Sequence, residues 1–469
     1  MSNKNDVFRY EKLAAIDRSP IQVLKNLSGK KKFLLESTFQ HEKKGKFSFL
    51  GVNPYEEVIG RDDETTVIHL ETKKTETKKI SALKYLESNL PKIAIDLALP
   101  FFGGAVGYVG YDAIRQFEDI GNALPDELDM PDLHFMLYRD TIVFDHARNE
   151  IYLIAVNVDD EAESRLEARI EQLKTAVTQN EVPIERNLEN IQFKPDITEE
   201  YFKEKVNIAK EHIERGEVLQ VVLSQRMTAK VDPNSDFALT FYQKLRKANP
   251  SPYMFYIDFE DYLILGASPE SLVEITGKEI VTNPIAGTRP RGSTAAEDEF
   301  LENELLADEK EIMEHRMLVD LSRNDLGRFC EVNSITIPTF MVVEKYQYVM
   351  HIVSEVKGRL RENISSIDAL IACLPAGTVS GSPKVRAMQI INQLEEKKRG
   401  AYGGGIGYIN FNHDLNIALT IRSLVIKDNF AHIQAGAGIV RDSVPENEYQ
   451  ETLNKAKSLI ELQQLDPIN

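Results

Sequence analysis

The sequence contains no tryptophan and only two cysteines, Cys330 and Cys373, among its 469 residues. The two cysteines show no metal-ligand or redox spacing, which favours a protein of a reducing compartment. No run of about 18 apolar residues occurs anywhere, and the first 20 residues lack the apolar segment of a secretion signal. We therefore expect a cytoplasmic protein that does not span a membrane.

Basic residues are too few to balance the acidic ones. The chain has 56 Lys and Arg against 74 Asp and Glu, so its formal net charge is −18. This charge argues against nucleic acid and against an anionic membrane surface as partners. An anionic small molecule would have to be bound by a few local cations.

The apolar pattern predicts an α+β protein. Residues 1–160 are mostly strands, including segments 136–145 and 150–158 joined by a hairpin. Residues 161–195 are highly charged with apolar residues at helical spacing, which predicts an exposed helix and linker. Residues 196–469 alternate strands with single helices. We expect a composite sandwich, with two facing, mainly antiparallel β-sheets and helices on the outside.

The stretch 308–328 predicts one long helix that carries two carboxylates at the edge of its apolar face. Glu311 and Glu314 are three residues apart and therefore share a face of the helix. Taken alone, such a pair is most often a solvated surface. A second pair with the same spacing, Glu448 and Glu451, stands near the C-terminus. Two such pairs favour a hard-cation site, and Mg²⁺ prefers oxygen ligands of this kind.

Three glycine-containing segments, 284–292, 374–384 and 436–438, are predicted as turns whose backbone N–H groups suit an anion. Ordinary turn chemistry explains each of them equally well when it is considered alone. Arg422 is expected in the middle of a strand covering 415–426, where a cation must be paired or must bind an anionic ligand. His351 also lies in an expected strand, where a histidine is more often a structural core residue.

Several long motifs resemble the chorismate-utilising enzymes, most closely their anthranilate synthase component I branch. They are PIAGTRPRG, EHRMLVDLSRND, PAGTVSGSPK, TIRS, QAGAGIV and ETLNK. The resemblance extends from residue 34 to residue 457. It implies a composite α/β sandwich, chorismate as substrate, Mg²⁺ as cofactor, and release of anthranilate and pyruvate as the first step of tryptophan biosynthesis.

The resemblance also implies roles for individual residues. Glu314 and Glu451 match the Mg²⁺ ligands, with Glu311 and Glu448 in support. The catalytic positions that match are Glu270 as general acid, Glu311, His351, Thr378 and Lys455. The substrate contacts that match are Gly287, Thr288, Tyr402, Arg422, Gly436, Ala437 and Gly438. A tryptophan feedback pocket would include Ser37, Pro252, Tyr253 and Met254, although ordinary strand and turn packing explains these four residues equally well.

Two positions bear on the branch of the family. Isochorismate and salicylate synthases need a base that activates water and carry a lysine where this chain has Gln220. Ammonia is already a nucleophile, so an enzyme that uses ammonia needs no such base. Aminodeoxychorismate synthases often carry a lysine at the position of Ala286, but some carry alanine, so aminodeoxychorismate synthase component I stays an alternative. A non-catalytic amino-acid-binding relative is a further alternative.

Neither cysteine stands in the motif of an amidotransferase nucleophile. Ammonia from glutamine would therefore come from a separate glutamine amidotransferase subunit, component II, in an expected heterotetramer. The division predicted from sequence is a regulatory region at 1–160, a charged helix and linker at 161–195, and a chorismate-binding catalytic region at 196–469.

Overall fold

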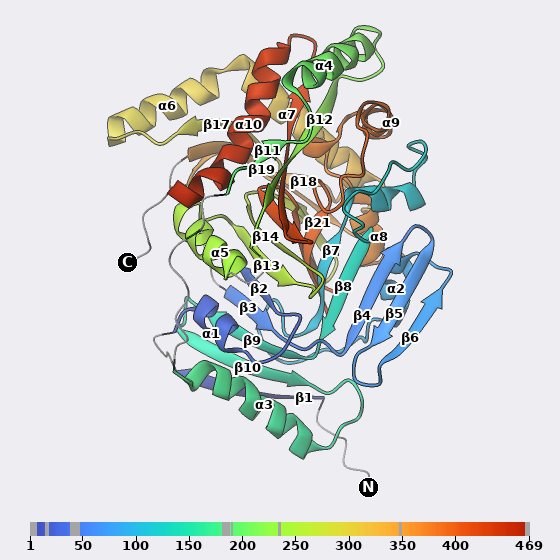
Figure 1. Ribbon diagram of the computed structural model, residues 1–469, viewed down its shortest axis with the longest axis vertical. Coiled ribbons are helices and arrows are strands. Elements are labelled where there is room, and N and C mark those ends of the chain that lie inside the picture. Colours follow the sequence, from blue (N-terminus) through green and yellow to red (C-terminus); the bar gives the residue numbers. More distant parts are fainter. Residues whose placement is uncertain are drawn as a thin grey trace.

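The computed structural model describes residues 7–14, 18–37, 47–180, 188, 191–232, 236–346 and 349–464. Within these ranges, two large antiparallel sheets face each other and helices cover their outer sides (Figure 1). The predicted fold class is therefore confirmed. Part of the predicted linker, 181–187 and 189–190, lies outside the described residues.

The first sheet contains strands from both ends of the chain. Its order is β1 (Phe8–Ala14), β10 (Glu150–Val156), β9 (Asp140–Asp145), β3 (Phe47–Gly51), β2 (Phe33–Glu36), β13 (Tyr253–Asp258), β14 (Tyr262–Ser268), β23 (Ser423–Lys427), β24 (Phe430–Ile439), β12 (Gln220–Lys230) and β11 (Lys194–Pro195), with β20 (Gly381–Ser382) also pairing with β12.

The second sheet is built in the same composite way. Its order is β17 (Ile285–Pro290), β19 (Val349–Arg359), β16 (Glu279–Thr282), β15 (Ser271–Thr276), β22 (Leu415–Leu419), β21 (Gly405–Asn410), β7 (Gly104–Val109), β8 (Leu133–Tyr138), β4 (Glu56–Arg61), β5 (Glu64–His69) and β6 (Lys74–Lys78), with β18 (Thr336–Lys345) also pairing with β19.

The helices alternate with these strands along the chain. They are α1 (Pro20–Asn26), α2 (Ala82–Asn89), α3 (Glu163–Thr178), α4 (Glu199–Glu214), α5 (Phe237–Ala248), α6 (Ala295–Ala307), α7 (Glu309–Gly327), α8 (Ser366–Cys373), α9 (Lys384–Leu394) and α10 (Pro445–Ile460), with the 3₁₀ segments η1 (Tyr111–Gln116), η2 (Gly377–Val379) and η3 (Glu461–Gln464).

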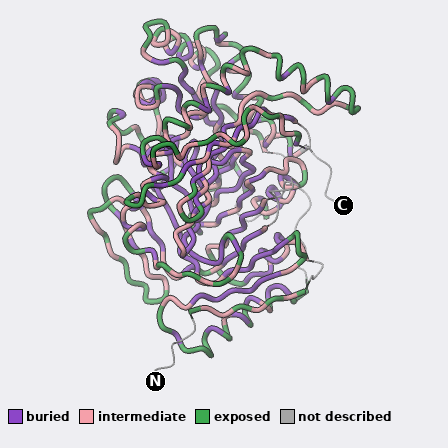
Figure 2. Tube along the Cα trace, turned by 180° about the vertical axis from the view of Figure 1, so that it is seen from behind, coloured by how far each residue is buried: buried purple, intermediate pink, exposed green. Residues whose placement is uncertain are grey.

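Both sheets continue across the predicted division between the two halves of the chain. In the first sheet, β2 pairs with β13, and Leu35 stands opposite Phe255. In the second sheet, β7 pairs with β21. The largest apolar cluster contains residues of both halves, such as Phe101 and Ile417, which are fully buried. The buried backbone is concentrated along the strands (Figure 2).

A second apolar cluster lies under the helices that cover the first sheet. Leu166 and Val177 of α3 belong to it, together with Phe241 of α5 and Leu459 of α10. The sequence predicts α3 as an exposed helix, but its apolar stripe is buried against the strands β1, β9 and β10. Its charged residues lie on the other face, which explains why composition alone indicates exposure.

The chain changes sheet at two places where the sequence predicts continuous strands. One strand is predicted for residues 136–145, but β8 belongs to the second sheet and β9 to the first. One strand is likewise predicted for residues 415–426, but β22 and β23 belong to different sheets. A continuous apolar run is satisfied by two buried strands as well as by one, so hydrophobicity alone does not reveal the break.

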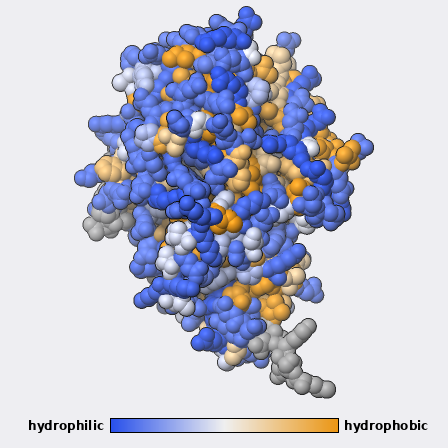
Figure 3. Space-filling model, turned by 90° about the vertical axis from the view of Figure 1, so that its right-hand side faces the viewer, coloured by the Kyte–Doolittle hydropathy of each residue, from blue (hydrophilic) through white to orange (hydrophobic). Residues whose placement is uncertain are grey.

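Among the described residues, no helix is long and apolar enough to cross a membrane. The face seen in Figure 3 is mostly hydrophilic, with separate apolar patches.

Candidate active site

The candidate site lies where two segments that cross between the sheets run side by side. One segment joins β14 to β15 and carries Glu270, and the other joins β22 to β23 and carries Arg422. The backbone amide of Ala267 donates to the carbonyl oxygen of Arg422 at 3.1 Å. The backbone amide of Leu419 donates to the carbonyl oxygen of Glu270 at 2.9 Å. The sheet change therefore brings a carboxyl and a guanidinium group to the same region.

Arg422 is not in the middle of a strand, as the sequence predicted. It lies in the crossing segment with φ of 51°, a backbone region that non-glycine residues seldom adopt. Its Nη1 donates to the carbonyl oxygen of Lys455 at 2.7 Å, and burial lowers the pKa of the guanidinium. Glu451 and Tyr402 act electrostatically on the same group. No full ion pair to Arg422 occurs among the described residues, so its charge is available to an anionic ligand.

Glu270 is a buried carboxyl group with one hydroxyl partner. Its side chain is 9% exposed, and its Oε1 accepts a hydrogen bond from Thr378 Oγ1 at 2.9 Å. Burial raises the pKa of Glu270 to about 7, and the Thr378 hydroxyl and the charge of Lys455 oppose that rise. A carboxyl with this pKa is partly protonated near neutral pH, which suits a general acid.

Lys455 connects α10 to the strand β24. Its Nζ donates to Glu451 Oε1 at 2.6 Å and to the carbonyl oxygen of Gly436 at 2.9 Å. The Tyr402 ring packs against this strand, since a Cβ atom added at Gly436 would lie 2.8 Å from the Tyr402 hydroxyl. Glycine at this position therefore leaves room for the tyrosine.

Residues 436–438 form part of β24 and not the turn that the sequence predicted. Gly436, Ala437 and Gly438 pair with β12, and Ala437 is fully buried in the apolar core. A Cβ atom added at Gly438 would clash with Nε2 of the Gln220 side chain. Small residues are needed here because side chains of neighbouring elements cover the strand.

Gly287 and Thr288 lie in an edge strand instead of the predicted loop. The β17–β19 ladder has an irregularity between Ala286 and Thr288, and Gly287 has φ of 67°. His351 Nδ1 lies 2.9 Å from the carbonyl oxygen of Gly287 and 3.0 Å from the hydroxyl of Thr288. A carbonyl oxygen only accepts hydrogen bonds, so Nδ1 carries the proton and Nε2 is the free acceptor. Burial lowers the pKa of His351, which favours the neutral ring.

Helix α7 begins and ends within one residue of its predicted bounds, and it presents Glu311 and Glu314 at the site. Asp308 caps it, because its Oδ1 accepts from the amides of Lys310 at 3.1 Å and Glu311 at 3.2 Å. Burial raises the pKa of Glu314, and the charges of Glu311 and Glu451 raise it further. Carboxylates from α7 and α10 therefore repel one another across the site, and a cation would relieve this repulsion.

In the described part of the chain, no group of three or more His, Cys, Asp or Glu side chains is arranged to hold a metal ion. This is compatible with the predicted Mg²⁺ site, since Mg²⁺ is usually held by one or two carboxylates together with water and substrate oxygens. The half-buried Glu314 and the more exposed Glu451 repel each other and fit such a two-carboxylate site. The supporting residue Glu448 is 8% exposed, and its pKa is also raised by burial.

The sequence motif around Gly287 also contains a residue to which sequence reasoning gave no role. Arg289 donates to Asp308 Oδ2 at 2.9 Å and lies 3.9 Å from Glu311. It therefore ties the edge strand β17 to the start of α7. The signal is present in the sequence, since an arginine follows Thr288 directly, but its carboxylate partner cannot be identified without the fold.

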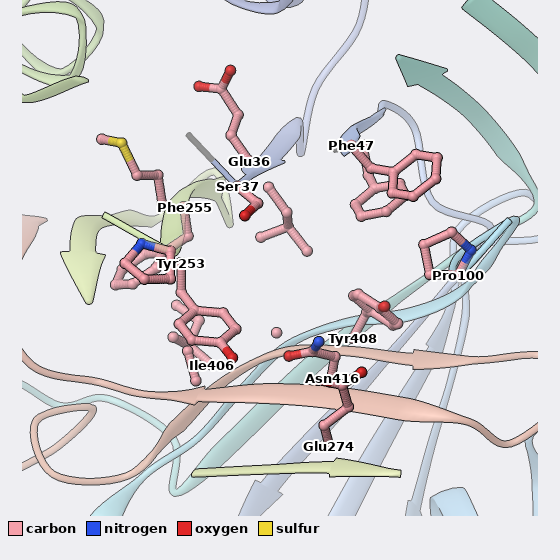
Figure 4. A pocket seen from close by; sticks show the side chains of 16 residues that line it. Glu36, Ser37, Phe47, Pro100, Tyr253, Phe255, Glu274, Ile406, Tyr408 and Asn416 are labelled. Atoms are coloured by element: carbon pink, nitrogen blue, oxygen red, sulfur yellow. The ribbon is translucent and has the colours of Figure 1, made fainter. Parts of the chain in front are cut away.

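A separate cavity of about 280 Å³ lies between the sheets, and all four residues of the predicted feedback pocket line it. Figure 4 shows the side chains of Ser37 and Tyr253 directed towards the hollow, while the carboxylate of Glu36 points away from it. Glu36 instead accepts from Tyr242 Oη at 2.9 Å and from Arg246. The sequence did not identify the opposite wall, which includes Tyr408, Asn416, Glu274 and Ile406.

A family model described as chorismate binding enzyme matches residues 30–461. The chain belongs to that family. Among curated relatives of the chorismate binding enzymes, anthranilate synthase component 1 of Lactococcus lactis is 44% identical over 462 residues, covering 97% of this chain and 100% of the relative. The protein of the same name from Thermus thermophilus is 43% identical and covers 91% of each chain.

Solved structures agree with this membership. Anthranilate synthase component I of Streptococcus pneumoniae superposes with a TM-score of 0.81 at 40% identity, covering 96% of this chain and 99% of the other. The menaquinone-specific isochorismate synthase of Escherichia coli superposes with a TM-score of 0.74 at 19% identity, covering 98% and 95%. The second likeness concerns the fold alone.

Proposed function

We propose that this protein is the large subunit of an anthranilate synthase, which converts chorismate and ammonia to anthranilate and pyruvate through 2-amino-2-deoxyisochorismate. The observation that carries the proposal is Glu270, a buried carboxyl with a pKa of about 7 on which the charge of Lys455 acts, while Arg422 donates to the carbonyl oxygen of the same lysine. The relatives named anthranilate synthase component 1, at 40–44% identity over most of their length, support the same reaction.

In the first half of the reaction, ammonia adds to the chorismate ring and the C4 hydroxyl group leaves. Protonated Glu270 donates its proton to the departing oxygen, and the Thr378 hydroxyl holds Oε1 and thereby fixes the direction of the carboxyl. General acid catalysis of this kind contributes a rate factor of about 10² to 10⁴. In the second half, the free Nε2 of neutral His351 can accept the ring proton as pyruvate leaves.

Two cations anchor the carboxylates of the substrate. Arg422 offers a planar fork of N–H groups in a buried setting, where a charge-assisted hydrogen bond is strong. Lys455 is held by Glu451 and by the carbonyl oxygen of Gly436, so its ammonium group is oriented before substrate binds. Glu314 and Glu451 would hold Mg²⁺, and the bound ion would neutralise the ring carboxylate as negative charge develops.

Gln220 supports ammonia, and not water, as the nucleophile. It is 4% exposed and its amide faces Gly438 in β24, next to the residues that contact substrate in this proposal. A carboxamide is not a base and cannot activate water, whereas ammonia is already nucleophilic. Aminodeoxychorismate synthase shares this feature, so the product itself must be identified.

We also propose two regulatory and assembly features. The cavity lined by Ser37, Pro252, Tyr253 and Met254 binds L-tryptophan as a feedback inhibitor, since it offers aromatic walls and the half-buried carboxylate of Glu274 among its lining residues. Ammonia is delivered by a glutamine amidotransferase subunit in a heterotetramer, because the relatives are named as first components.

The test is a product analysis with the purified chain. Chorismate, Mg²⁺ and an ammonium salt are incubated at mildly alkaline pH, and the products are separated by chromatography. We expect anthranilate and pyruvate in equal amounts, with the Glu270→Gln variant inactive. A product that keeps the enolpyruvyl group, 4-amino-4-deoxychorismate, would assign the chain to the alternative branch.

A further inference from the structure

A small, partly polar cavity of about 40 Å³ lies against Glu270 and Thr378, and the space itself has no role in the reaction described so far. Strands β15 and β16, helix α7 and the segment before η2 form its walls. Besides Glu270, the side chains with polar or sulfur atoms that line it are Ser271, Thr282, Asn283, Ser322, Asp325, Cys373 and Thr378, whose hydroxyl is bonded to Glu270. A buried water needs about 10–15 Å³ of such space and two to four polar partners, so the cavity has room for roughly three waters.

Two buried hydroxyls in this cavity make no hydrogen bond within the described part of the chain. Thr282 is 7% exposed, and its Oγ1 makes no hydrogen bond within the described part of the chain. Buried hydroxyl groups are nearly always hydrogen-bonded, either to protein or to ordered water. Ser271, which is 5% exposed, lies next to Glu270 in sequence, and its hydroxyl likewise makes no hydrogen bond within the described residues. Both hydroxyls therefore favour small hydrogen-bonding occupants of the cavity.

A mostly buried ion pair forms another part of the wall. Asp325 lies about two helical turns beyond Leu318 on α7, and its Oδ2 accepts from Lys384 Nζ at 2.7 Å. The two side chains are 18% and 12% exposed, so each keeps a small accessible surface. The charged groups that act on Asp325 are Lys384 and Arg328, and the only one that acts on Glu270 in the described chain is Lys455.

The proposed reaction leaves Glu270 in need of a proton. When ammonia replaces the C4 hydroxyl, Glu270 gives one proton to the leaving oxygen, which departs as water. The ammonium group formed on the ring releases one proton at a different carbon, so the overall reaction consumes none. Glu270 is nevertheless left as a carboxylate and must regain a proton before the next turnover, and a route through the cavity would allow this before the product has left.

We propose that the cavity holds a short chain of waters that returns a proton from the Asp325 side to Glu270. Thr282 and Ser271 are positioning residues that orient these waters and do not touch substrate. The inference rests on the proposed role of Glu270 as general acid and extends it by naming the source of its proton.

The test compares Thr282→Val, which keeps the shape but removes the hydroxyl, with Thr282→Ser, which keeps the hydroxyl. Thr141→Val is a matched control, since Thr141 is a fully buried strand threonine whose hydroxyl donates to the carbonyl oxygen of Phe102 at 3.2 Å, away from this cavity. Steady-state rates are measured with chorismate and ammonium, in H₂O and in D₂O. We expect kcat of Thr282→Val to fall about tenfold, a modest part of the 10²- to 10⁴-fold range of acid catalysis.

Four further readouts separate a relay from a packing effect. The KM values for chorismate and ammonium should stay within about twofold in Thr282→Val, because proton return follows binding. The solvent isotope effect on kcat should increase. Added imidazole, a small acid that can enter the site, should restore part of the rate that Thr282→Val loses. The kcat of Thr282→Ser should be close to that of the parent. If Thr282→Val does not fold, Ser271→Ala undergoes the same measurements.

The outcomes are distinguishable from a failure of the proposed function. If Glu270→Gln keeps full activity, the acid role itself is wrong. If Glu270→Gln is inactive but Thr282→Val has normal kcat and a normal isotope effect, only the relay is wrong. A raised KM for ammonium with unchanged kcat would show that the cavity carries the nucleophile instead of protons, which would also overturn the inference.

Discussion

Tyr253 pairs with Ser268 across the β13–β14 ladder, and the Ser268 hydroxyl accepts from the backbone amide of Glu270 at 3.3 Å. Tyr253 forms part of the wall of the large cavity between the sheets. The wall of the proposed feedback pocket and the segment that holds Glu270, the proposed general acid, are therefore joined by a strand pair and by the Ser268 hydroxyl. A ligand in the cavity can alter the site by favouring one arrangement of this segment over another.

The first prediction concerns inhibition by tryptophan. Ser37→Arg would place a long cation in the cavity and remove the hydroxyl that points into it (Figure 4). We expect the ratio of rates with and without tryptophan to approach one. In the parent, tryptophan and chorismate should weaken each other's binding equally, by about 5- to 150-fold. Since the chain has no tryptophan of its own, bound ligand can be followed by its fluorescence. Equal inhibition of variant and parent would place the pocket elsewhere.

The second prediction concerns stability at alkaline pH. The folded-state pKa of Glu270, about 7, lies above its usual value of 4.5. The stabilisation from the neutral carboxyl is therefore complete below about pH 4 and is lost as pH rises through about 7. We expect the free energy of unfolding of Glu270→Gln to exceed that of the parent at pH 8, by up to about 3 kcal/mol, and to differ little at pH 5. Thermal or denaturant unfolding at both pH values measures this difference. If the difference in unfolding free energy between the variant and the parent is the same at pH 5 and at pH 8, the pKa of Glu270 is not raised.

The third prediction concerns the metal. Glu314→Gln and Glu451→Gln should each lower turnover by at least about 100-fold while sparing the fold, because each removes repulsion between carboxylates and the Glu451–Lys455 ion pair is an exposed one. Thermal unfolding of the parent should shift upwards with Mg²⁺, and this shift should disappear in both variants. Glu309→Gln, an exposed change on the same helix, serves as control. Full activity of the parent in EDTA would rule out the metal assignment.

The fourth prediction concerns the anchoring of substrate. Arg422→Lys keeps the positive charge but loses the planar fork and the hydrogen bond to the Lys455 carbonyl. We expect the KM for chorismate to rise by the equivalent of about 1.5–3 kcal/mol, the range for hydrogen bonds to charged groups. Thermal unfolding should be measured in parallel. A normal KM with reduced thermal stability would mean that Arg422 has a structural role.

Much of the fold could be predicted from local patterns. The sequence predicts helix α7 from 308 to 328, and the structure places it at Glu309–Gly327 between caps at Asp308 and Arg328. Helix α9 is predicted at its observed bounds, Lys384–Leu394. Both have clear local signals, a capping aspartate in one and a preceding Ser-Pro in the other.

Predictions that depended on long-range pairing were less accurate. For the segments containing Arg422, Gly287 and Gly436, the sequence predicts a strand, a loop and a turn, respectively. The structure places them in a sheet-crossing segment, an edge strand and a central strand. In each case, the conformation is set by strands from distant parts of the chain, which periodicity within a short window does not report. The small cavity beside Glu270 has the same origin, since its walls come from residues 270–284, 318–325 and 373–378.

The shared sheets have a consequence for how this protein could be divided. Removing the first 160 residues would strip β2 from β13 and β7 from β21, leaving two long, uncovered strand edges. Such edges are templates for pairing between molecules. The two halves are therefore not exchangeable modules, and a shortened chain that begins near residue 196 should aggregate instead of folding as an unregulated enzyme.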